Sequence, residues 1–201
     1  MNKDELINQF SSEANTGVQF GGLFSTLTLF FSGLLISNYN SFPSYVRVPL
    51  LFLILSTFGF VYATLIYANA TSLLNSDSIK SCSKALNTAD ILSEFFGVYA
   101  LLVAIPLVIP VVTNDIFLIF SVFVTDVAGM VIYHISRYSV ILEYFPKTHF
   151  LIIGITILLM LMMLVLLKSD LQIPLLILVS TTITLLAGIS FYATKKINLV
   201  R

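Results

Sequence analysis

The sequence predicts an all-α membrane protein: a polytopic bundle of six transmembrane helices with both termini in the cytoplasm. Three observations support this fold class. The chain of 201 residues is 58% apolar and only 10% charged, whereas an ordinary soluble domain is about 25% charged. Six apolar stretches are long enough to cross a hydrocarbon core of about 30 Å. Lysine and arginine are also divided unequally between alternate loops.

The first three predicted spans are residues 17–37, 48–73 and 89–112. The first span ends where Asn, Ser and Pro residues form a turn-rich segment. The second begins with Pro49, because proline is tolerated in the first turn of a helix. The third carries Pro106 and Pro110, which free backbone carbonyls and favour either a packing kink or a gate.

The last three predicted spans are residues 115–136, 150–167 and 171–194. Only Thr113 and Asn114 separate the third span from the fourth, so we expect a tight helical hairpin with Asp115 as the N-cap. The segment LKSDLQIP makes a similar connection between the fifth and sixth spans. The fifth span is almost uniformly apolar, and we expect it to be the most lipid-exposed helix.

The topology follows from the basic residues, which concentrate on the cytoplasmic side of membrane proteins. One set of loops and tails carries eight Lys and Arg residues, and the alternate set carries two. The chain is therefore predicted to be a multi-pass protein of the cell membrane with both termini inside. The eight are Lys3, Lys80, Lys84, Arg137, Lys147, Lys195, Lys196 and Arg201, and the two are Arg47 and Lys168.

The short connections indicate a single domain over residues 1–201. It comprises a cytoplasmic amphipathic segment (1–16), a membrane bundle (17–194) and a cytoplasmic tail (195–201). Two cytoplasmic segments have an apolar helical face and either lie flat in the membrane interface or pack on a neighbouring helix end. These faces are Leu6, Ile7, Phe10 and Ala14 in the first segment, and Val140, Ile141, Tyr144 and Phe145 in the second.

Stripes of small residues mark the faces on which membrane helices pack closely, although such stripes can also line a polar pathway. The first span has two neighbouring stripes, and the second and sixth spans have one each. They are Gly21, Ser25, Thr28 and Ser32; Gly22, Thr26 and Gly33; Ser56, Gly59, Ala63, Tyr67 and Ala70; and Thr181, Thr184 and Gly188.

Asp126 is the deepest ionisable residue, because it stands in the middle of the fourth span. No Lys or Arg lies at its depth in any predicted span. An acid there is costly and commonly marks an ion or proton pathway. Its spacing aligns it with Gly129, Tyr133, Ser136 and Arg137 in a polar stripe toward the cytoplasm. Two interpretations stay open: a proton or cation site, or a protonated or hydrogen-bonded aspartate that holds helices together.

The third span opens with Asn87, Asp90 and Glu94 on one helical face. Across the predicted hairpin, Glu94 lies near the depth of His134, and Asp90 near that of Arg137. We therefore expect either acid–His and acid–Arg pairs, or an acidic helix start with an ordinary interfacial ion pair. His134 is either a pH-sensitive group or simply hydrogen-bonded.

The sequence contains no nucleotide, metalloprotease, redox or nucleophile-elbow motif. We therefore expect neither an enzyme nor a cofactor or metal site, and the balanced charge argues against nucleic acid as a partner. The lone Cys82 is expected to be a free thiol in a loop.

Two functions remain. The first is a small channel or transporter-like protein whose proton or cation site uses Asp126, Glu94, Asp90, His134 and Tyr133. The second is a non-catalytic membrane subunit or scaffold that docks a partner protein. The expected partners are the lipid bilayer, a second copy of the chain or another membrane protein.

Overall fold

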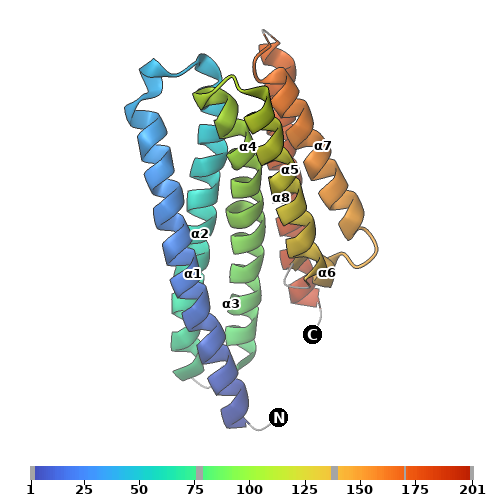
Figure 1. Cartoon of the computed structure of the whole chain (residues 1–201). Coiled ribbons are helices and arrows are strands. Elements are labelled where there is room, and N and C mark those ends of the chain that lie inside the picture. Colours follow the sequence, from blue (N-terminus) through green and yellow to red (C-terminus); the bar gives the residue numbers. More distant parts are fainter. Residues whose placement is uncertain (1–2, 76–78, 137–139, 170, 200–201) are drawn as a thin grey trace.

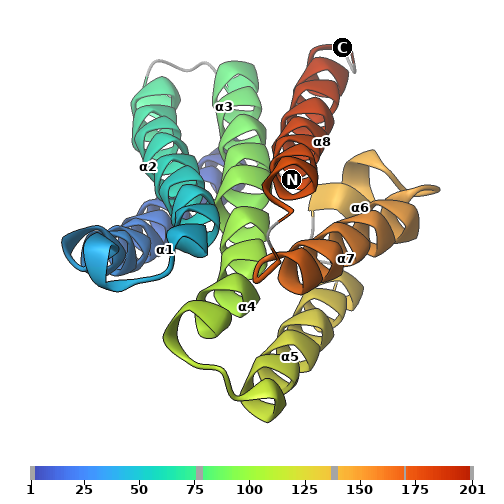
Figure 2. The same ribbon diagram turned by 90° about the horizontal axis from the view of Figure 1, so that it is seen from above.

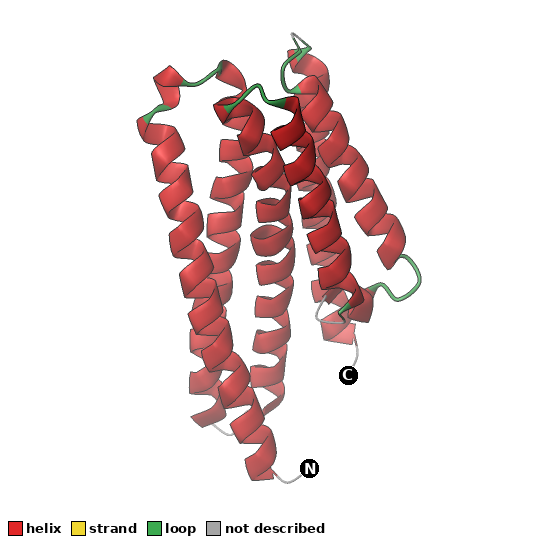
Figure 3. Cartoon of the chain, in the orientation of Figure 1, coloured by secondary structure: helices red, strands yellow, loops and turns green. Residues whose placement is uncertain are grey.

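The computed structural model describes residues 3–75, 79–136, 140–169 and 171–199. Every regular element in these ranges is helical (Figure 3). Six helical stretches are long and apolar enough to cross a membrane, which confirms the predicted number of spans. The N-terminus of α1 and the C-terminus of α8 lie at the same end of the bundle (Figure 1).

The elements follow one another as an antiparallel series of helices with short connections. They are α1 (Lys3–Ser37), η1 (Tyr39–Ser41), η2 (Ser44–Val46), α2 (Arg47–Asn75), α3 (Ile79–Leu92), the π-helix η3 (Ser93–Tyr99), α4 (Ala100–Val112), α5 (Ile116–Ile135), α6 (Val140–Tyr144), α7 (His149–Leu166) and α8 (Gln172–Leu199). The predicted hairpin between the third and fourth spans is confirmed. Asp115 caps α5 by accepting hydrogen bonds from the backbone N–H groups of Phe117 and Leu118, at 2.9 and 3.2 Å.

Several helices are much longer than a membrane is thick. The 20 residues of α5 rise about 30 Å, the thickness of the hydrocarbon core. The 35 residues of α1 rise about 52 Å by the same measure. Helices α1, α2 and α3 extend beyond α5 and α7 at the end that holds both termini (Figure 1). The bundle therefore has a polar helical extension on one side.

Residues 3–16, expected to form an amphipathic cytoplasmic segment, continue directly into α1. The extension also corrects an expectation from the sequence. Residues 79–88 are the first turns of α3 and not a loop. Cys82 is therefore a fully buried residue of a helix, packed near Ala14 and Leu86. Charged residues end a membrane span, but they do not end a helix that continues into water and packs on its neighbours.

The first small-residue stripe of α1 packs on α2, and part of the α2 stripe packs on η3, as expected for close helix packing. Thr28 of α1 is buried and accepts a hydrogen bond from the Thr57 hydroxyl of α2 at 2.9 Å. Gly59 of α2 packs directly on the backbone of η3, and the Ser56 hydroxyl donates to the Gly97 carbonyl at 2.8 Å. The second stripe of α1 is different, because a Cβ added at Gly22 or Gly33 would meet nothing within 4 Å.

Two other packing expectations were wrong. Only 11% of the apolar 18-residue stretch of α5 is buried, against 28% of the corresponding stretch of α7. Helix α5 is therefore more exposed than the almost uniformly apolar α7. Figure 2 shows why, since α5 lies at the edge of the bundle beside α4. The predicted stripe of α8 is also exposed, and its buried face carries Thr182 and Ser190 instead. Apolar side chains suit lipid and protein equally, so composition alone does not identify the packed face.

Both amphipathic segments pack on neighbouring helices, which is one of the two alternatives expected from their periodicity. Ala14 is fully buried in α1, and Phe10 packs against the same cluster. In α6, Ile141 is fully buried and Tyr144 is 8% exposed. The apolar faces recognised in the sequence therefore cover neighbouring helices.

Candidate cation vestibule

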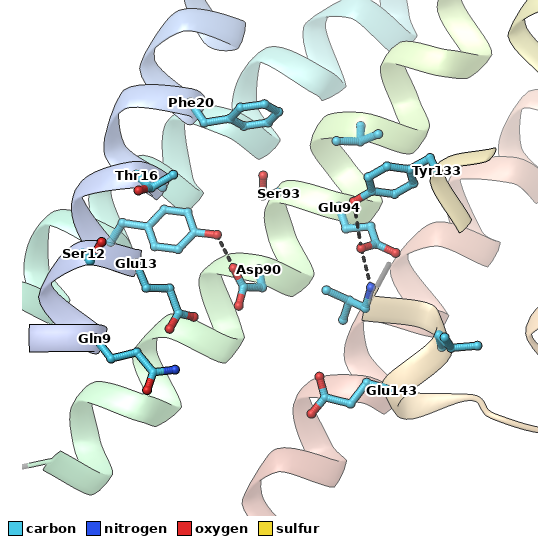
Figure 4. A pocket seen from close by; sticks show the side chains of 15 residues that line it. Gln9, Ser12, Glu13, Thr16, Phe20, Asp90, Ser93, Glu94, Tyr133 and Glu143 are labelled. Carbon is cyan, nitrogen blue, oxygen red and sulfur yellow. Dashed lines mark hydrogen bonds between the residues drawn. The ribbon is translucent and has the colours of Figure 1, made fainter. Parts of the chain in front are cut away.

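A cavity of about 970 Å³ lies where the long helices emerge from the bundle (Figure 4). We call it the vestibule. Its walls come from α1, α2, α3, η3, α5 and α6, so segments far apart in the sequence meet there. The lining residues are Gln9, Ser12, Glu13, Thr16, Gly17, Phe20, Tyr67, Asp90, Ser93, Glu94, Val98, Tyr133, Val140, Leu142 and Glu143.

The vestibule is acidic. Four carboxyl groups line it, each from a different element: Glu13 (α1), Asp90 (α3), Glu94 (η3) and Glu143 (α6). No Lys, Arg or His is among the lining residues in the described part of the chain. The charged groups among the described lining residues are therefore all acidic. A cleft with charges of one sign and low-dielectric walls concentrates counter-ions.

Asp90 is fixed on one wall by a tyrosine of α2. The Tyr67 hydroxyl donates a hydrogen bond to Oδ1 of Asp90 (Figure 4). The Tyr67 ring in turn lies under Gly17 of α1, where an added Cβ would come within 2.6 Å of the ring. The absence of a side chain at residue 17 thus lets α1 approach the ring that holds Asp90. The expected partner of Asp90, Arg137, lies outside the described residues.

Glu94 is fixed on the opposite wall and is 2% exposed. Its Oε2 accepts hydrogen bonds from the Tyr133 hydroxyl at 3.2 Å and from the backbone N–H of Val140 at 2.5 Å. Its Oε1 accepts a third, from the N–H of Ile141 at 3.2 Å. The first N–H groups of a helix have no partner within that helix. The Glu94 carboxylate satisfies two of them at the start of α6.

The expected pair between Glu94 and His134 is therefore wrong. His134 lies on another face of α5, and its ring packs on His149 and Phe150 of α7, with centroids 5.0 and 5.8 Å apart. Neither ring nitrogen of His134 has a hydrogen-bond partner among the described residues. Backbone N–H groups outcompete the imidazole because α6 presents two unsatisfied donors directly to Glu94.

Asp126 lies apart from the vestibule, on the inward face of α5. The buried residues of this helix are Phe123, Asp126, Met130 and His134. Gly129 and Ser136, which the helical spacing aligns with Asp126, are both exposed, whereas Tyr133 is half-buried. Asp126 itself is 7% exposed, and its buried Oδ2 has no hydrogen-bond partner within the described chain. Asp126 is thus a buried acid in mid-span, and the described residues supply no hydrogen bond to Oδ2 that would offset its loss of hydration.

The structure thus brings together Asp90, Glu94 and Tyr133 and leaves Asp126 and His134 outside the vestibule. Glu13, Tyr67 and Glu143 also line the vestibule and were not predicted as parts of the site. One signal could have found the α1 wall, since its lining residues recur at helical spacing. They are Gln9, Ser12, Glu13, Thr16 and Phe20, at positions i, i+3, i+4, i+7 and i+11.

The described residues contain no group of three or more His, Cys, Asp or Glu side chains placed to hold a metal ion. The chemistry available to the vestibule is electrostatic attraction together with hydrogen-bond acceptance by carboxylate and hydroxyl oxygens.

No known family model matches the chain, and neither a curated protein nor a solved structure is significantly similar to it.

Proposed function

We propose that this membrane protein is a small channel or transporter-like protein that takes up a proton or a small cation through the vestibule. The observation that carries the proposal is the set of four carboxyl groups around one cavity with no described basic lining residue. Such a cavity raises the local concentration of cations and disfavours anions. No catalytic step and no cofactor are part of the proposal.

The four carboxyl groups divide into two kinds. Asp90 and Glu94 accept hydrogen bonds from tyrosines and are held in place. Glu13 and Glu143 have no hydrogen-bond partner within the described chain, and Glu143 is exposed. We assign the fixed pair to the walls of the vestibule and the other two to the first contact with an incoming cation.

Asp126 is proposed as the central titratable group of the pathway. It lies seven residues from Tyr133 on α5, which is about 10 Å along the helix axis. Buried polar groups usually have a hydrogen-bond partner, so one that lacks it requires an explanation. A proton or cation that binds Asp126 would supply one, since acids at this depth commonly mark ion pathways. His134 lies one turn beyond Met130 on the same buried face.

The excess of basic residues at one end supports a cytoplasmic position for both termini. On this topology, the vestibule faces the cytoplasm, because it lies at the end of the bundle where α1 begins and α8 ends (Figure 1). The cell membrane is the proposed location.

Flux through liposomes that contain the purified full chain tests the proposal. Proton and cation flux are measured for the wild type, for Glu13→Gln in the vestibule and for Glu5→Gln, a matched charge removal nearer the start of α1 that does not line the cavity. We expect flux above protein-free liposomes, reduced by Glu13→Gln and maintained by Glu5→Gln. Equal flux with and without protein, or equal flux in the two variants, would overturn the proposal.

One observation favours the alternative function, a non-catalytic subunit or scaffold. Thr181, Thr184 and Gly188 of α8 line an open apolar groove flanked by Phe145 and Tyr192. Small residues of this kind allow close approach of another membrane helix, either from a second copy or from another membrane protein. Affinity purification from native membranes tests this function, and a chain that always emerges alone as a monomer would count against it.

A further inference from the structure

A second cavity, of about 470 Å³, lies beside the vestibule on the first turns of α3. We call it the α3 groove. Its apolar lining comes from Phe10 of α1, Ile79 of α3 and Ile197 of α8, and Glu143 of α6 lines both this groove and the vestibule. The character of the two cavities differs, because the α3 groove contains lysines and the vestibule does not.

Four polar residues of α3 face the groove together: Lys80, Ser83, Lys84 and Asn87. Their spacing of i, i+3, i+4 and i+7 places them on one side of the helix. Among the described residues, none of these four side chains makes a hydrogen bond or an ion pair. Two ammonium groups, one hydroxyl and one amide are therefore available as hydrogen-bond donors in one place.

The opposite wall adds to this donor set. Tyr144 also lines the groove, and burial, together with the negative charges of Glu143 and Asp90, raises the pKa of its hydroxyl to about 12. The phenol is therefore a neutral hydrogen-bond donor at physiological pH. Lys196 of α8 lies behind this wall and donates to the Tyr144 carbonyl at 3.0 Å. Against these groups, Glu143 is the single carboxylate among the described lining residues.

We propose that the α3 groove binds a phosphate group, held by Lys80 and Lys84 with Ser83 and Asn87 as further donors. Phosphate is the ligand that matches clustered ammonium, hydroxyl and amide donors, because its oxygens accept several charge-assisted hydrogen bonds. The phosphate belongs either to an anionic lipid headgroup or to a soluble compound. Basic pockets between helices at a membrane surface bind anionic headgroups in this manner. The groove borders the cation vestibule and shares Glu143 with it, but its lysine, serine and asparagine donors do not line the vestibule.

Native mass spectrometry of the full chain in detergent tests this proposal with three probes: phosphatidic acid, phosphatidylcholine and inorganic phosphate. The variant is Lys80→Gln with Lys84→Gln. The matched control is Lys147→Gln with Lys195→Gln, which removes the same charge from lysines that do not line the groove. We expect preferential retention of phosphatidic acid over phosphatidylcholine. The groove variant should weaken it about thirtyfold, given the usual contribution of two lysines near an anionic surface, and the control should stay near the wild type.

The same experiment separates the two sources of phosphate. Displacement of phosphatidic acid by inorganic phosphate supports a site that recognises the phosphate group alone, and retention of the lipid despite inorganic phosphate supports a headgroup site. Equal binding of phosphatidic acid and phosphatidylcholine without binding of inorganic phosphate would overturn the proposal. So would an equal loss in the groove and control variants, because it would show non-specific attraction to the basic end of the protein.

Discussion

The Tyr133 hydroxyl of α5 donates a hydrogen bond to Glu94 of η3 at 3.2 Å, across 39 positions of sequence. The same carboxylate accepts the first two backbone N–H groups of α6. One buried side chain thus connects the two helices of the hairpin and fixes the short helix α6, which lines the vestibule. The site depends on this junction for its shape.

Replacement of Glu94 by glutamine should loosen α6. The amide has one acceptor oxygen where the carboxylate has two, so at least one hydrogen bond is lost at a cost of about 1–3 kcal/mol. We expect faster hydrogen exchange of the Val140 and Ile141 amides and a lower free energy of unfolding in detergent. Tyr133→Phe is the control, because it removes one hydrogen bond and leaves both backbone contacts. Unchanged amide exchange in Glu94→Gln would contradict the assigned role.

Gly59→Ala should separate α2 from η3. A Cβ at this position would lie 2.3 Å from the carbonyl carbon of Phe96, and a backbone atom cannot move aside as a flexible side chain can. We expect a loss of about 1–3 kcal/mol in unfolding free energy, the usual cost of overpacking. Gly154→Ala in α7 is the matched control, since nothing lies within 4 Å of its added Cβ. Equal unfolding midpoints for the two variants would show that the close approach is not required.

Cys82 should resist a water-soluble maleimide while the protein is folded. The thiol is fully buried where α3 packs on α1 and α2, and a reagent needs access to a thiolate. Labelling should become fast only after denaturation, as followed by mass spectrometry over time. Rapid labelling of the folded protein would place Cys82 in an exposed loop, as the sequence had suggested.

The sequence predicted the number of spans correctly because the hydrocarbon thickness sets a minimum apolar length. It underestimated the helices at the polar end. Lys80 and Lys84 end an apolar run and so indicated a loop, yet both belong to α3. In water a charged residue is a good helix former, and the extension packs on its neighbours. Apolar length therefore gives the membrane-embedded part of a helix and not its full extent.

The candidate site was predicted only in part, because it also depends on the full extent of α1 and on the orientation of α5. Asp90 and Glu94 stood out as acids near a span, and the structure places both in one cavity with Tyr133. Glu13 lay in a segment assigned to the cytoplasm, and only the continuous helix α1 brings it to Asp90 (Figure 4). The neighbours of Asp126 depend on which face of α5 turns inward, and apolar residues on every side gave little information about that orientation.

Proton and cation flux through Asp126→Asn, compared with the wild type in the same liposomes, determines whether Asp126 is the central titratable group of the proposed pathway. Asparagine nearly preserves the size of the side chain and removes its ability to carry a proton or a charge. We expect Asp126→Asn to lose most of the flux and Asp126→Glu to retain part of it, with both variants folded and incorporated like the wild type. Wild-type flux that is unchanged in Asp126→Asn would contradict the claim that Asp126 is the central titratable group.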